Sequence, residues 1–199
     1  MSKQVIIRGL CMVFMFNIAG CGSSPKAKFY IMNTLDRELS SMVKTDKIAI
    51  RLAPVTIPEV LLRPQIVTRT AKNRLVLNEF NRWGGDFQED FQRIMGENLA
   101  ILLATDHVIL SQDITPLTTD VQITINVRRF DGQLGGQVIL NTDWAIASGS
   151  RGQKIMAKKS VLQENTDGSD YQAYVAAQSR LLAKLSQEIS AEITRQLKN

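Results

Sequence analysis

The sequence of 199 residues is 44% hydrophobic and 22% charged, which allows one domain with a substantial core and leaves little room for a second. Its formal net charge is +5 and falls to +3 without the two basic residues of the first 20. Because the Lys and Arg residues are also dispersed, the charge argues against a nucleic-acid-binding protein.

The first 21 residues have the pattern of a signal peptide. Two basic residues precede the apolar run Leu10–Ile18, which is far shorter than the roughly 20 residues that cross a membrane. The tetrapeptide that ends at Cys21 resembles the lipobox of bacterial lipoproteins, in which the cysteine thiol receives a diacylglyceryl group. We expect cleavage between Gly20 and Cys21 and lipidation of Cys21; the alternative is a plain signal peptide followed by a chance cysteine.

This pattern divides the chain into a signal peptide (1–20), a lipidated N-terminus with a flexible tether (21–28) and a periplasmic domain (29–199). Gly22 follows the cysteine, where an aspartate would indicate retention in the inner membrane of enterobacteria. We therefore expect the periplasmic face of the outer membrane, with the inner membrane as the alternative. Apart from the diacylglyceryl and N-acyl groups on Cys21, no cofactor is expected, and Cys11 leaves with the signal peptide, so no disulfide is expected.

Alternation of apolar and polar residues predicts most of the strands of the domain. A turn is expected at Lys72-Asn73, and a glycine-rich hairpin loop at Asp131–Gly136, where glycine can adopt positive φ. The expected strands are Phe29–Met32, Ile48–Leu52, Ile66–Thr70, Arg74–Phe80, Val121–Arg128, Val138–Ile146 and Lys154–Gln163.

Two amphipathic helices are predicted, each with a capping box at its start. The first begins near Asp86, with Glu89 three residues later, and the second begins at Ser169, with Gln172 three residues later. The order of strands and helices favours an α+β fold, a single domain in which both helices pack on an antiparallel sheet.

The sequence contains little that suggests catalysis. Its one histidine, His107, follows Asp106, but neighbouring residues on a strand point to opposite faces. The sequence has none of the common motifs for a catalytic serine nucleophile or for nucleotide binding. The glycines of 132–136 lack the strand-to-helix context of a phosphate-binding loop. We therefore expect no enzyme activity, no catalytic residue and no metal site.

The segment 54–83 is the strongest candidate for a functional site. Three prolines within residues 54–64 predict that the chain leaves the sheet after Leu52 and crosses the surface. One interpretation is an edge crossover whose tryptophan fills the core, and the other is a partner-docking loop. The docking hypothesis names Pro58, Arg63, Pro64, Gln65, Arg69 and Trp83, and expects that losing Arg63 and Arg69 would leave stability nearly unchanged.

Two stretches, APVTIPEVLLRPQIVTR and NEFNRWGGDFQEDFQRIMGENLAILL, resemble the ABC-transport auxiliary lipoproteins. This resemblance implies a non-catalytic component of an envelope lipid transport system. It would dock an MCE-domain protein, which spans the periplasm from an inner-membrane partner, and it would do so as a homo-oligomer such as a ring. A stand-alone periplasmic lipid carrier is the alternative, and it would need an apolar cavity between sheet and helices.

Overall fold

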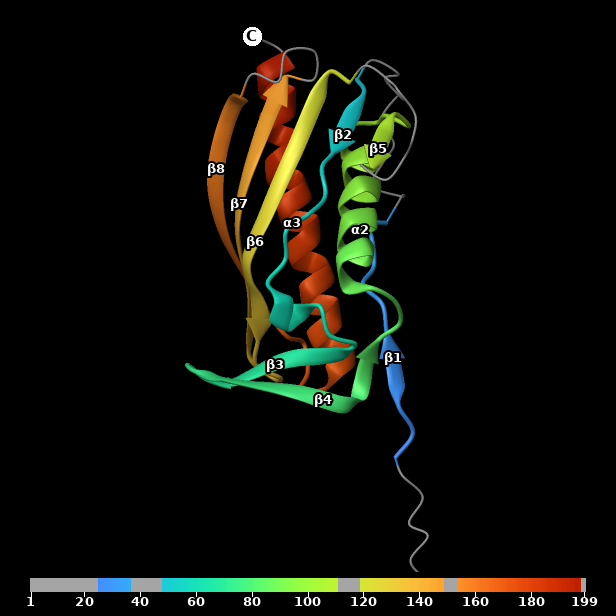
Figure 1. Cartoon of the computed structure of the whole chain (residues 1–199), viewed down its shortest axis with the longest axis vertical. Helices are drawn as coiled ribbons and strands as arrows, with labels where there is room; N and C mark the ends of the chain where they lie inside the picture. The colour runs from blue at the N-terminus through green and yellow to red at the C-terminus, as the bar shows by residue number, and fades with distance from the viewer. Residues whose placement is uncertain (1–24, 37–47, 111–118, 149–153, 198–199) are drawn as a thin grey trace, which may run out of the picture.

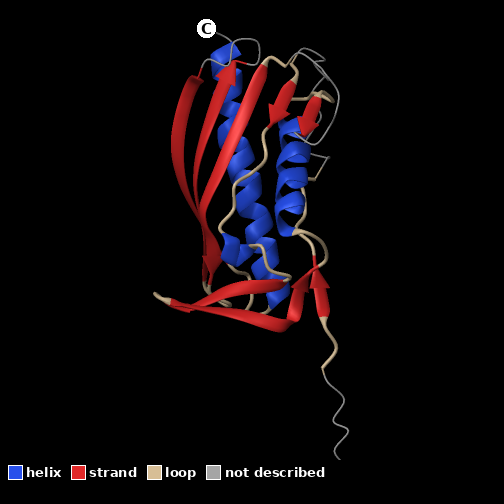
Figure 2. Ribbon diagram, viewed as in Figure 1, coloured by secondary structure: helices blue, strands red, loops and turns tan. Residues whose placement is uncertain are grey.

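Eight strands form two separate sheets in the computed structural model, which describes residues 25–36, 48–110, 119–148 and 154–197. Two long helices lie against the larger sheet, and the smaller sheet crosses one end of the molecule (Figures 1 and 2). The α+β prediction for a single domain is confirmed.

The larger sheet has the strand order β5-β2-β6-β7-β8. As predicted, β6 (Val121–Gly132), β7 (Gln137–Ser148) and β8 (Lys154–Asn165) form an antiparallel meander. Gly135 has a φ of 68° in the turn between β6 and β7, which agrees with the expected use of glycine in this loop.

The prediction of a purely antiparallel sheet is wrong at the other edge. There, β2 (Ile50–Leu52) runs parallel to both β6 and β5 (Val108–Leu110). Two parallel strands need a crossover connection that brings the chain back to the end of the sheet where the first strand began. The connection between β2 and β5 is of this kind and includes a helix.

The smaller sheet, here called the basal sheet, consists of β1 (Lys28–Tyr30), β4 (Arg74–Trp83) and β3 (Gln65–Ala71) in that order. β3 and β4 form an antiparallel hairpin with the turn at Lys72-Asn73, as predicted. β1 is parallel to the end of β4. Figure 1 shows this sheet at the lower end, where the N-terminal segment enters the fold.

The helices begin close to the predicted positions. The side chain of Asp86 accepts hydrogen bonds from the backbone N–H groups of Gln88 and Glu89, so it caps α2 (Phe87–Leu102) as expected. In α3 (Tyr171–Leu197) the prediction of Ser169 as the cap is wrong, because the Asp170 carboxylate accepts from the N–H of Ala173. A carboxylate there also interacts favourably with the helix dipole.

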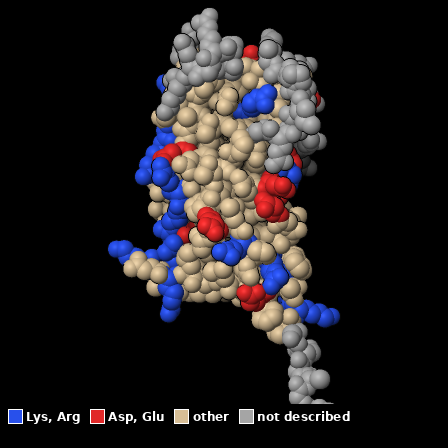
Figure 3. All heavy atoms as spheres, in the orientation of Figure 1, with Lys and Arg blue, Asp and Glu red and all other residues tan. Residues whose placement is uncertain are grey.

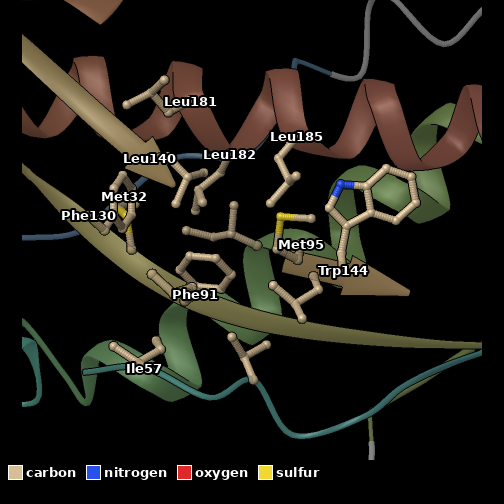
Figure 4. Close-up of a cluster of buried hydrophobic side chains, with 14 of the residues drawn as sticks. Met32, Ile57, Phe91, Met95, Phe130, Leu140, Trp144, Leu181, Leu182 and Leu185 are labelled. Atoms are coloured by element: carbon tan, nitrogen blue, oxygen red, sulfur yellow. The ribbon is translucent and has the colours of Figure 1, made fainter. Parts of the chain in front are cut away.

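The core lies between the larger sheet and the two helices. Figure 4 shows side chains from α2, α3 and the strands filling this space, with the Phe91 and Phe130 rings edge to face at 5.9 Å. The Trp144 indole N–H donates to the Ser160 hydroxyl at 2.8 Å, which satisfies its one polar group inside the core. None of the helices in the described ranges is long and apolar enough to span a membrane.

Candidate functional site

The only histidine of the chain lies at the surface of the described structure. The side chain of His107 is exposed just before β5, and its backbone carbonyl accepts a hydrogen bond from Ile50. Among the described residues, no group of His, Cys, Asp and Glu is arranged to hold a metal ion. The expected lipidation site Cys21 and the cleavage site after Gly20 lie outside the described residues.

The proline-rich crossover of residues 53–64 is fixed against the larger sheet. The N–H of Thr56 donates to Ile125, and the N–H of Val127 donates back to Thr56, so the segment follows β6 beyond the end of β2. The predicted departure from the sheet is therefore only partial. The side chains of Val55, Ile57 and Leu61 are buried, the last of them in the short 3-10 helix η2 (Glu59–Leu61).

Between these buried side chains, the crossover displays others to solvent. Val60, Leu62 and Arg63 are all exposed, and the Arg63 guanidinium lies 3.9 Å from the carboxylate of Glu59. The buried side chains and the bonds to β6 anchor the backbone that carries this exposed surface.

Three of the predicted docking residues meet where β3 begins and β4 ends. The backbone N–H of Trp83 donates to the carbonyl of Pro64 at 2.8 Å, and Gln65 is the register partner of Arg82. The Trp83 ring is only 7% exposed and packs on Phe87 at 4.9 Å between centroids. The structure therefore places Trp83 in the core, in line with the edge-crossover interpretation.

Arg69 forms the most buried ion pair at this end of the fold. Its Nε and Nη2 donate to the two carboxylate oxygens of Asp131 at 2.6 and 2.8 Å, and Arg129 donates to the same carboxylate at 2.9 Å. Burial alone raises the pKa of Asp131, but the two arginines together lower it by more. In contrast to the expectation that losing Arg69 and Arg63 leaves stability nearly unchanged, we now expect loss of Arg69 to destabilise the fold, because Asp131 would lose its main partner.

The exposed edge of the basal sheet carries a small polar network. The side-chain amide of Gln65 donates to Glu79 at 3.1 Å, and Arg82 donates to the same carboxylate at 2.9 Å. Both hydrogen bonds lower the pKa of Glu79, and the bond from Gln65 has the larger effect. Of the six predicted docking residues, Arg63 and Pro64 are exposed, and Pro58 and Gln65 are half-buried.

Sequence reasoning missed the exposed apolar side chains that surround this site. Val60 and Leu62 lie beside Arg63 in the crossover. A second group lies on the basal sheet and directly after β1. The alternation of Phe29 and Ile31 with Tyr30 and Met32 is the one signal that could have revealed part of it. This second group consists of Phe29, Ile31, Val76, Leu77 and Phe80.

Two hollows of about 350 Å³ each lie elsewhere on the described surface. One surrounds the start of α2, and its lining includes Asp86, Glu89 and Arg93. The other lies on β6, β7 and β8 around Asp143 and Lys159. Both are open to solvent.

A family model described as "ABC-type transport auxiliary lipoprotein component" matches residues 34–190. Among curated proteins, none matches the chain in sequence. A crystal structure of a Xanthomonas campestris protein of the DUF330 family has a TM-score of 0.69 at 15% identity, covering 86% of this chain and 98% of that chain. A crystal structure of an uncharacterised protein has the same TM-score at 19% identity, covering 85% of this chain and 99% of that chain. At these identities the two structures establish a shared fold.

Proposed function

This chain belongs to the family of ABC-type transport auxiliary lipoproteins, and we propose that it is a non-catalytic, lipid-anchored component of an envelope lipid transport system. In this proposal acyl chains on Cys21 hold it to the periplasmic face of the outer membrane. There it docks an MCE-domain protein that spans the periplasm from its inner-membrane partner.

The observation that carries this proposal is the exposed part of the crossover, whose backbone is anchored by buried side chains and by bonds to β6. Exposed apolar residues on a fixed backbone suit a docking surface, since little conformational entropy is lost on binding. Val60 and Leu62 supply apolar area, and Arg63, beside Pro64, supplies a charged group that enters the interface from its rim. Because the side chains of Arg69 and Trp83 serve the fold, we assign docking to the crossover surface of Pro58, Val60, Leu62, Arg63 and Pro64.

The filled core favours docking over the alternative of a stand-alone lipid carrier. Phe91, Met95, Phe130, Leu140 and Leu182 occupy the space between sheet and helices (Figure 4), and each is fully buried. An acyl chain would have to displace such side chains, which are close-packed in protein interiors.

The proposal also includes assembly of several copies into a ring. β8 is an edge strand of 12 residues in the larger sheet, and a long free edge can pair with a strand of another chain. Repeating one heterologous contact with a suitable rotation closes a ring.

A gentle detergent pull-down of the tagged full-length lipoprotein from crosslinked membranes tests this proposal, with co-purified proteins and lipids identified by mass spectrometry. We expect an MCE-domain protein and its inner-membrane partner in the eluate. Phospholipid without any such protein would contradict the docking role and support the carrier.

A pair of variants locates the surface within the same experiment. Leu62→Asp places a charge in the crossover surface and should reduce recovery of the MCE-domain protein about tenfold or more, as loss of an interface anchor does. Leu197→Asp changes an equally apolar, exposed residue at the far end of α3 and should leave recovery unchanged. Equal recovery with both variants would show that the crossover surface does not dock the partner.

A further inference from the structure

Exposed apolar side chains gather at one end of this molecule. Of the ten large apolar side chains that are exposed in the described residues, seven belong to the basal sheet, the residue after β1, or the crossover. Phe29 and Ile31 are 68% and 62% exposed, which is unusual for large apolar groups so close together. Phe80 on the neighbouring strand is 42% exposed.

Positive charge gathers at the same end. Residues 25–32 and 58–82 contain seven Lys and Arg against two Asp and Glu, and six of the seven remain when Arg69, which is paired with the buried Asp131, is left out. The rest of the chain from Cys21 onward contains fifteen against seventeen. Figure 3 shows basic side chains at the projecting β3–β4 hairpin and along the lower edge of the molecule. The Phe29 position pairs with Arg82 in the parallel register of β1 and β4, so an aromatic and a basic side chain share one face of the sheet.

The sequence also limits how far this end can lie from the membrane. Lys28, the first residue of β1, lies seven positions after the predicted acylated Cys21. A flexible chain of that length reaches only about 15 Å. β1 is therefore the structured element nearest the lipid headgroups.

We propose that the basal sheet is a second membrane contact, in which Phe29, Ile31 and Phe80 enter the headgroup region of an anionic bilayer while the surrounding Lys and Arg bind lipid phosphates. Apolar side chains that insert at the interface add their buried area to the electrostatic attraction of the basic residues. A second copy of this chain is a poorer occupant, because two such basic patches repel each other.

This contact goes beyond the docking role. The acyl chains alone would leave the domain free to tilt on its tether. With the basal sheet on the membrane, α3 stands away from the bilayer with its C-terminal end outermost, as the vertical arrangement in Figure 1 suggests. The crossover surface lies just above the basal sheet, so this contact would fix its height and direction for an incoming partner.

Fluorescence quenching by lipid tests the contact on the full-length lipoprotein in vesicles of phosphatidylethanolamine and phosphatidylglycerol. Phe80→Trp and, separately, Phe29→Trp place a reporter on the basal sheet, and a nitroxide-labelled phospholipid with the label near its headgroup serves as the quencher. The wild-type chain, whose Trp83 and Trp144 are buried, provides the baseline. We expect the added emission to fall about twofold, because interfacial side chains reach about 5–10 Å into the headgroup boundary.

Leu197→Trp is the matched control. Leu197 is 59% exposed at the other end of the 27-residue helix α3, which is about 40 Å long, so its reporter should escape the quencher. Quenching at Phe80 and Phe29 equal to that at Leu197 would overturn the proposal. Emission that is blue-shifted but not quenched by lipid would also overturn it, because it would show that a second copy or another protein covers the sheet. Either result leaves the pull-down of the MCE-domain protein as a separate test of docking.

Discussion

The guanidinium of Arg69 donates to both carboxylate oxygens of Asp131, at 2.6 and 2.8 Å, and this pair joins the basal sheet to the larger sheet. The Tyr174 hydroxyl lies in the same region, donating to the carbonyl of Val67 and accepting from the N–H of Gly132, both at 3.0 Å. These hydrogen bonds therefore connect β3, β6 and α3 within one buried polar cluster. The orientation of the basal sheet depends on these contacts.

Arg69→Ala should lower the free energy of unfolding by about 3 kcal/mol. This value is at the lower end of the cost of removing one partner of a buried ion pair, because Arg129 would still donate to Asp131. Chemical denaturation measures this loss. Arg63→Ala is the matched control, and as an exposed residue it should change stability by less than about 0.5 kcal/mol. Equal stability of the two variants would contradict the structural role of the pair.

Stability should also fall in acid. The pKa of Asp131 is lowered in the folded protein, because the two arginines outweigh the opposite effect of burial. A group of this kind stabilises the fold above its unfolded-state pKa, and the stabilisation is lost as pH falls through its folded-state pKa. We expect the free energy of unfolding to decline below about pH 4.

Asp131→Asn isolates the contribution of this carboxylate to the acid response. Glu164 has a pKa that Lys184 and Arg180 lower against the effect of burial, so the variant should still lose stability in acid. Its decline should nevertheless be shallower than that of the wild type. Parallel pH curves from denaturant titrations would show that Asp131 does not carry the effect.

Gly132→Ala should destabilise the fold severely, by about 4 kcal/mol or more, or prevent folding. A Cβ at this position would lie 2.2 Å from the carbonyl oxygen of Gln137 and 2.5 Å from the Cα of Val138, both backbone atoms of the facing strand. Gly85→Ala is the control, since a Cβ there meets nothing within 4 Å. Thermal unfolding compares them, and a similar midpoint for both would contradict the close approach of β6 and β7.

The proposed lipidation of Cys21 can be tested separately. The full-length chain should incorporate radiolabelled palmitate and sediment with outer-membrane vesicles, because two or more acyl chains anchor a protein stably. Cys21→Ser should remove the label and leave the signal peptide uncleaved. Label retained by this variant would mean that acylation occurs elsewhere, and sedimentation of the wild type with the inner membrane would contradict the proposed location.

The strands and helices could be predicted because their signals are local. Val121, Ile123 and Ile125 alternate with polar residues, and all three are buried as the period of two requires. Beyond Val127 this period fails, because a register shift lies between Val127 and Arg129 and the strand continues to Gly132. A bulge of this kind leaves no clear mark in a single sequence.

The remaining features depend on contacts between distant positions. The parallel pairing of β2 with β6 joins Ile50 to Val121, and the partner of Arg69 lies 62 residues away at Asp131. Proline spacing correctly indicated an unusual crossover, but it could not show which side chains would be buried. The spacing therefore groups Trp83 and Arg69 with Arg63, although only Arg63 of the three is exposed.

A site-specific crosslinking experiment tests the docking role most directly. A photo-reactive amino acid replaces Leu62 in the crossover surface of the full-length lipoprotein in intact cells, and a second strain carries it at Leu197. We expect an adduct with an MCE-domain protein from position 62 and none from position 197. The absence of that adduct at position 62, with equal expression and membrane anchoring of both proteins, would contradict the docking role.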